Sequence, residues 1–159
     1  MASPDTDLHS VAFFLADHAA VENGKVYVNG GFWDRLRLPS FPAVVSFSVV
    51  AVLHIPWRAH LQSHRLQVTF EDEDSNPIGG GFEAEFRVGS APDMERGNPS
   101  IMPIAAGVGG FALPRAGGYA AVLKVDGTEI SRWRFRANQV IAPVGPPAES
   151  PGADSPNAE

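Results

Sequence analysis

The chain has 159 residues, of which 44% are hydrophobic and 19% charged, and it has no cysteine. This length predicts one hydrophobic core, and the lack of cysteine excludes disulfides and thiolate metal sites. The formal net charge of -6 argues against the broad basic surface by which proteins bind nucleic acids, so no nucleic-acid partner is expected.

The apolar segments are too short for a membrane helix. The longest mainly apolar run covers residues 43–55 and is interrupted by Ser46, Ser48 and His54, whereas a spanning helix needs about 20 apolar residues. The first ten residues, MASPDTDLHS, contain two aspartates and neither lysine nor arginine, unlike a secretory signal. We therefore expect a cytoplasmic protein without a membrane segment.

Two strands are predicted near the N-terminus, joined by a hairpin turn. Asp17 follows the first strand, where its carboxylate would accept backbone N–H groups of a turn over residues 19–21. Asn23-Gly24 marks the hairpin, because both central residues of a type I′ turn need positive φ. Gly30-Gly31 shifts the apolar register of the second strand, which predicts a β-bulge.

Apolar and polar residues alternate with a period of two in several later segments. Odd positions from Val45 to Ile55 are apolar, and residues 65–71 and 82–88 alternate in the same way. This is the period of a strand with one buried face. Residues 56–60 predict one helical turn, and Gly79-Gly80-Gly81 a bulge or a close backbone approach.

The sequence thus predicts an all-β fold, a single-domain antiparallel β-sandwich of about eight strands, of Greek-key type and similar to Ig or C2 domains. The sandwich covers residues 7–142, between a flexible N-terminus (1–6) and a disordered, proline-rich tail (143–159). In LPRAGGY, Tyr119 is predicted to form a tyrosine corner. The predicted strands are 8–16, 25–38, 43–55, 62–72, 78–88, 103–113, 118–126 and 128–138.

The acidic turn after residue 71 has the spacing of a calcium loop, with Asp72, Asp74 and Asn76 followed by Glu83. The position that must be glycine is Pro77, whose φ is locked negative. We therefore interpret this turn as a solvated hairpin tip. No metal or cofactor is expected, and calcium-dependent membrane docking is the weakest hypothesis.

The segment HIPWRAHLQSH contains the candidate pocket at one end of the sandwich. Its members are His54, Trp57, Arg58, His60 and His64. An aromatic residue beside convergent polar groups is typical of small-ligand sites. A shared metal on His60 and His64 would need a helix, for which the nearby proline leaves little room.

Arginines alternate with core residues in the last strand, EISRWRFRANQ. Trp133 and Phe135 share the predicted core face. On the other face lie the candidate interaction residues Arg132, Arg134 and Arg136. They would lie about 7 Å apart, twice the rise per residue. Such a row attracts a carboxylate-rich partner, a phosphate, or the chain's own acidic residues Glu71, Glu83 and Glu85.

The segments FLADHAAVENGKVYVNGGFWDRL, LQVTFEDEDSNPI and AGGYAAVLKVDG resemble a family of small bacterial proteins, also seen in phages and described only as a domain of unknown function. The resemblance covers residues 10–138 and implies an all-β domain, with no activity or catalytic residue to carry over. It is strongest at Asp17, Val21, Gly24, Lys25, Gly30, Gly31, Asp34, Gly118 and Tyr119.

The sequence contains no motif of a nucleophile–base pair, a metal site or a phosphate loop. The first hypothesis is therefore a non-catalytic binding or assembly module, whose partner is another protein or a second copy. The alternative is a ligand-binding or enzymatic pocket around the histidines. Enzymatic activity is left open, with a non-enzyme favoured, and no small-molecule ligand is identified.

Overall fold

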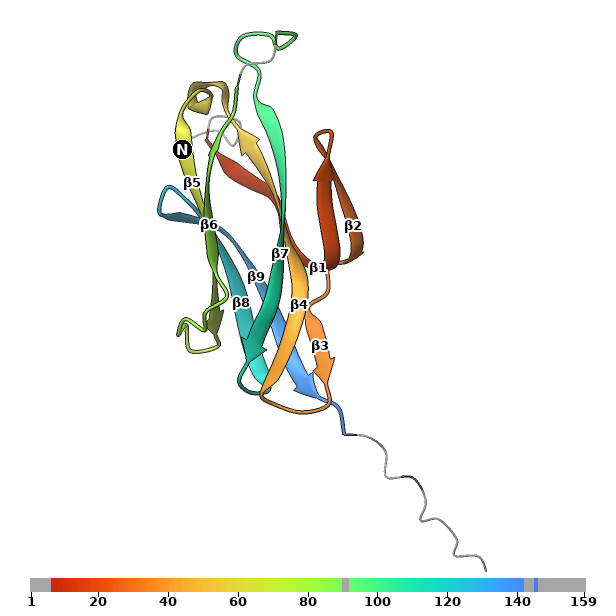
Figure 1. The fold of residues 1–159 in the computed structure, drawn as a ribbon. Helices are drawn as coiled ribbons and strands as arrows, with labels where there is room; N and C mark the ends of the chain where they lie inside the picture. Colours follow the sequence, from red (N-terminus) through yellow and green to blue (C-terminus); the bar gives the residue numbers. More distant parts are fainter. Residues whose placement is uncertain (1–6, 90–91, 142–144, 146–159) are drawn as a thin grey trace, which may run out of the picture.

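The computed structural model describes residues 7–89, 92–141 and 145, and these are organised in strands (Figure 1). The predicted N-terminus (1–6) and tail (143–159) lie outside the described residues, apart from Gly145. Within the described part, no helix is long and apolar enough to cross a membrane. The strands are β1 (His9–Glu22), β2 (Lys25–Gly31), β3 (Arg35–Leu38), β4 (Ala43–Ile55), β5 (Ser63–Asp72), β6 (Phe82–Arg87), β7 (Ser100–Leu113), β8 (Gly117–Val125) and β9 (Thr128–Gln139).

These strands form two sheets that pack together (Figure 1). One sheet has the order β2-β1-β4-β7, and the other has the order β3-β9-β8-β5-β6. Neighbouring strands are antiparallel except β3 and β9, which run parallel. The predicted antiparallel arrangement therefore holds for the other strand pairs and is wrong for this one. A parallel pair needs a long crossover connection, so no local turn signal announces it.

The predicted second strand, residues 25–38, is two strands in different sheets. β2 ends at Gly31, and β3 begins at Arg35. Between them Phe32 has a φ of 63°, which interrupts the extended chain. The register of β1 and β2 is the same on both sides of Gly30, so the predicted bulge is wrong and the strand simply ends there.

β1 continues past its predicted end at residue 16 and reaches Glu22. Residues 19–21 pair with β2, so Asp17 caps no turn. Its carboxylate instead lies against Gly30, where an added Cβ would come within 2.2 Å of the Asp17 Oδ2. The hairpin turn itself is confirmed, with φ of 50° and 71° at Asn23-Gly24.

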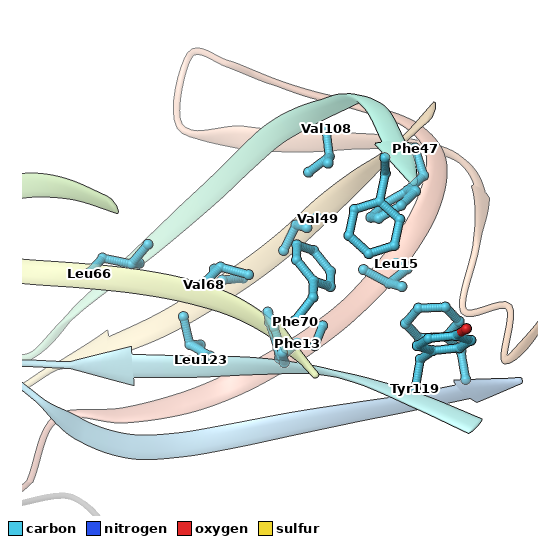
Figure 2. Packing of buried hydrophobic residues seen from close by; sticks show 14 of the residues in the cluster. Phe13, Leu15, Phe47, Val49, Leu66, Val68, Phe70, Val108, Tyr119 and Leu123 are labelled. Carbon is cyan, nitrogen blue, oxygen red and sulfur yellow. The ribbon is translucent and has the colours of Figure 1, made fainter. Parts of the chain in front are cut away.

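The main core lies between the sheets, with buried side chains from both facing each other (Figure 2). Phe47 of β4 and Phe70 of β5 pack edge to face, with ring centroids 5.7 Å apart. Phe111 of β7 contacts both rings, at 5.3 and 4.7 Å. Burying each such side chain contributes about 1.5–3 kcal/mol, so this contact between sheets is a main source of stability.

β4 is buried on both faces, although its sequence predicts one polar face. The predicted inward residues are at most 2% exposed from Val49 to Ile55. On the other face, Val50 is fully buried in a second cluster with Phe14 of β1. The Ser48 hydroxyl accepts the backbone N–H of Ala19 at 3.1 Å. A polar residue in a strand thus need not lie in solvent.

Tyr119 lies at the start of β8 and at one end of the core (Figure 2). Its phenol donates a hydrogen bond to the carbonyl of Arg115 at 2.6 Å, and the residue is 3% exposed. The bond runs back to nearby upstream backbone, which confirms the hydrogen bonding predicted for a tyrosine corner.

Two smaller predictions are also confirmed. Trp57–Ala59 form a short 3-10 helix, η1, within the predicted helical turn. Gly81 is a site of close backbone approach, because an added Cβ would lie 2.7 Å from the carbonyl oxygen of Val68. β6 begins at Phe82, directly after this glycine and later than predicted.

Candidate functional site

The arginine row lies on the outer face of β9, opposite the buried Phe135. On the neighbouring strand β8, Ala120 pairs with Arg134, and Gly118 pairs with Arg136. The alternation that the sequence predicts for this strand is therefore confirmed. The three arginines nevertheless differ in their surroundings.

Arg132 is held by two carboxylates of its own chain. Its guanidinium forms an ion pair with Glu71 of β5 and donates to Glu129 at 2.9 and 3.1 Å. The side chains of Arg132 and Glu71 are only 29% and 18% exposed. Hydrogen bonding from Arg132 lowers the pKa of Glu129. Glu83, a predicted partner of the row, instead accepts a bond from Arg65 at 2.6 Å.

Arg134 and Arg136 are exposed, and no ion pair joins either of them to another described residue. Strand β3 adds Arg35 directly beside Arg136 in the parallel register. The only ion pair of Arg35 within the described part is with Asp34, at 4.0 Å, and both side chains are about 70% exposed. Like charges side by side on adjacent strands repel, so this cluster favours an anionic group from outside.

A hollow of about 450 Å³ lies along this face of the five-stranded sheet. Its floor is β8, where Gly118 and Ala120 carry no side chain larger than a methyl group. We call this hollow the arginine groove. It is bounded on the side of β3 and β9 by Asp34, Arg35, Arg132, Arg134 and Arg136, and on the side of β5 by Glu71, Asp72, Glu73 and Ser75.

The acidic side of the groove includes the turn after β5. The Asp72 carboxylate accepts the backbone N–H groups of Asn76 at 2.9 Å and Asp74 at 3.0 Å. These bonds, the first above all, lower the pKa of Asp72. The guanidinium of Arg115 lies 3.6 Å from the same carboxylate. The Asp72 carboxylate therefore stabilises the turn that follows β5. In the described part, no group of three His, Cys, Asp or Glu side chains could hold a metal ion.

The two strand histidines of the alternative pocket are buried and have separate neighbours. His64 Nδ1 lies 2.8 Å from Asp126 Oδ2, and its Nε2 lies 2.9 Å from the carbonyl of Ala59. Both neighbours accept, so the protonated ring satisfies both. Burial lowers the pKa of His64, but these two bonds raise it more, and the net shift is upward. His54 stacks on His9, with ring centroids 4.5 Å apart.

The other three members lie in or beside η1. His60 is buried, 5.1 Å from Trp57 between ring centroids, and its ring nitrogens have no hydrogen-bond partner among the described residues. Arg58 forms an ion pair with Asp7. None of the five predicted pocket residues lines the arginine groove. The contacts of His54, His64 and Arg58 are thus with residues outside the predicted set of five, and only Trp57 and His60 pack against each other.

A family model described as a family of unknown function matches residues 11–138. The chain belongs to this family, DUF6941. The predicted resemblance to a domain of unknown function is therefore confirmed. The part that matches DUF6941 includes every residue that lines the arginine groove. No curated protein matches the chain.

DUF6941 is a family of unknown function, so the candidate site is defined by its geometry alone. The sequence did not predict two of its residues, Arg35 and Glu73. The single strand that the sequence predicts over residues 25–38 keeps Arg35 with β2 and gives no indication that Arg35 lies beside β9. A signal was available, because Arg35 and Arg37 alternate with Leu36 and Leu38 just as the arginines of β9 alternate with its core residues. Glu73 carried no such signal.

Proposed function

We propose that this chain is a non-catalytic binding or assembly module, which docks a protein partner through the arginine groove. The observation that carries the proposal is the cluster of Arg35, Arg134 and Arg136, three exposed guanidiniums on adjacent strands. In the described structure, Arg134 and Arg136 have no carboxylate partner, and Arg35 has only the exposed Asp34 at 4.0 Å.

Arginine supports a protein partner more than other anions. Its planar guanidinium binds carboxylates with two parallel hydrogen bonds, and it is enriched at protein interfaces, where lysine is depleted. The basic side of the groove is narrow, and the whole chain has a net charge of -6. Nucleic-acid binding needs a wider basic surface. An acidic protein surface is therefore the partner that this groove favours.

We also propose that the two sheets form a Greek-key sandwich of the immunoglobulin type in a bacterial cytoplasmic protein. Support comes from the strand orders, with β1, β4 and β7 together in one sheet and β5, β8 and β9 together in the other. The phenol of Tyr119, bonded to backbone upstream of β8, also supports this topology. In such a frame the outer face of the five-stranded sheet, on which the arginine groove lies, is available for docking.

The test is site-specific cross-linking in cells. A photo-reactive benzoylphenylalanine replaces Arg134, which lies in the groove. The matched control places the same residue at Val44, which is 71% exposed on the other sheet. We expect Arg134 to yield a discrete cross-linked protein, identified by mass spectrometry, that the Val44 variant does not yield.

Two results would overturn the proposal. One is the absence of a cross-linked species from the Arg134 position when the protein is folded and abundant. The other is the same set of products from both positions, since this would mean contact by collision only. Purified variants are checked by circular dichroism, so that loss of the fold is not mistaken for loss of the partner.

A further inference from the structure

We propose that the occupant of the arginine groove is a second copy of this chain, related to the first by a two-fold axis that runs along β8. The inference rests on the proposed function and names the partner for the same surface. It is carried by the opposite charges on the two sides of the groove, which make this face complementary to itself.

The charges lie in matched rows across β8. One row holds Glu71 on β5 and Arg134 on β9, because both pair with the same residue of β8. The next row on this face holds Gly118, which pairs with Arg136 and donates its N–H to Glu73 at 3.4 Å. The basic and acidic sides are separated by two strand spacings, about 10 Å.

A two-fold axis along β8 keeps each row at its height and exchanges the two sides of the groove. Arg136 of one copy then faces Glu73 of the other, and Arg134 faces Glu71. Each contact occurs twice, as in any interface of this symmetry. An axis that runs across the strands would place arginine over arginine. Charge therefore selects one orientation of the two copies.

The carboxylates on the acidic side of the groove can accept further hydrogen bonds. Arg132 is bonded to only one oxygen of the Glu71 carboxylate, Oε1. Glu73 is exposed, and the one hydrogen bond that it accepts from the described residues is long, at 3.4 Å. Both carboxylates can thus accept from a guanidinium that approaches from outside the sheet.

The size of the face is also sufficient. The five strands β3, β9, β8, β5 and β6, at about 3.3 Å per residue and 4.8 Å between strands, present a face of about 650 Å². Two such faces in contact would bury about 1,300 Å² in total, which lies within the range of specific protein interfaces.

The experiment is a charge reversal followed by sedimentation velocity of the purified full-length chain, from about 1 to 200 μM. Arg136→Glu places glutamate against Glu73 of the other copy, and Glu73→Arg places arginine against Arg136. We expect each change to weaken the dimer by at least about tenfold, because like charges then meet twice. Arg136→Glu and Glu73→Arg combined in one chain should restore the dimer to within about threefold.

Restoration by the combined change supports the two-fold interface, since an unrelated acidic partner would not be regained. A wild-type chain that stays monomeric up to 200 μM overturns the inference. So does a dimer that ignores both reversals, or a combined variant that remains as weak as the single ones. If a reversed chain melts early, Arg136→Gln and Glu73→Gln replace it, with a smaller expected loss.

These results separate this inference from the proposed function. A monomeric purified chain, together with a cross-link from Arg134 to a different protein, overturns the second copy and leaves the binding module intact. A cross-linked species of twice the chain's mass supports both. Failure of the cross-link overturns the docking function itself, and with it the proposed occupant.

Discussion

A single phenol joins β8 to the loop that precedes it. Tyr119 is buried and donates to the carbonyl of Arg115 at 2.6 Å. We expect Tyr119→Phe to lower the free energy of unfolding by about 1–2 kcal/mol, because the hydrogen bond from the buried Tyr119 to the Arg115 carbonyl is lost. Urea unfolding measures the change. Tyr27→Phe is the control, since Tyr27 is 55% exposed, and equal effects of the two changes would contradict this role.

A buried histidine makes stability depend on pH near neutrality. The bonds of His64 to Asp126 and Ala59 raise the pKa of His64 in the folded chain despite burial. A raised pKa stabilises the fold below the unfolded value of about 6.5, and this stabilisation is lost as pH rises through the folded value. The hydrogen bond from His64 in turn lowers the pKa of Asp126. Asp126 therefore stays ionised, and the ion pair with His64 stays formed, at acidic pH.

The check is urea unfolding of the wild type and of His64→Gln between pH 5 and 9. We expect the stability difference between them to shrink as pH rises above about 6.5. Titration of the ring by NMR should show a lower pKa for His64 in Asp126→Asn. A stability difference that stays constant over this range would show that the ring does not titrate as its bonds require.

The arginines of β9 differ in how much they contribute to stability. Arg132 contacts Glu71 and Glu129, whereas Arg134 has no ion pair with a described residue. We expect Arg132→Ala to lower the free energy of unfolding by about 1–2 kcal/mol, since charged hydrogen bonds are lost. In a chain dilute enough to be monomeric, Arg134→Ala should change it by less than about 0.5 kcal/mol. Thermal unfolding compares the two. Equal losses would mean that Arg134 also supports the fold.

At the scale of elements, one glycine sets the distance between the chain before β6 and its neighbour β5. A Cβ on Gly81 would lie 2.7 Å from the carbonyl oxygen of Val68, closer than real contacts allow. We expect Gly81→Ala to cost about 1–3 kcal/mol, because backbone rather than a side chain must move. Gly89→Ala is the control, with nothing within 4 Å of its added Cβ. Chemical denaturation of both variants decides the point.

At the scale of the whole molecule, a dimer links stability to concentration. If two copies associate through the arginine groove, mass action stabilises the folded chain more as its concentration rises. We therefore expect the Tm of the wild type to increase between about 2 and 200 μM, and the Tm of Arg136→Glu to stay constant. Differential scanning calorimetry measures both. A wild-type Tm independent of concentration would contradict association of the folded chain.

Local sequence patterns predict most of the strands, because the period of two and the turn residues are local properties. Asn23-Gly24 was recognisable from the φ values that a tight turn demands. The outward arginines of β9 followed from alternation with the core residues Trp133 and Phe135. Periodicity alone therefore indicates which arginines of β9 point outward.

Which side chains come into contact depends on the tertiary structure. Arg132 is tied to Glu71, 61 positions earlier, and Arg35 lies beside Arg136 in a parallel pair that no turn connects. The split of residues 25–38 between two sheets likewise occurs at Phe32, whose φ is positive although a bulky residue rarely takes such a value. Periodicity fixes the face on which a residue lies. Only the order of the strands fixes its neighbours, because that order depends on how the sheets bury their common core.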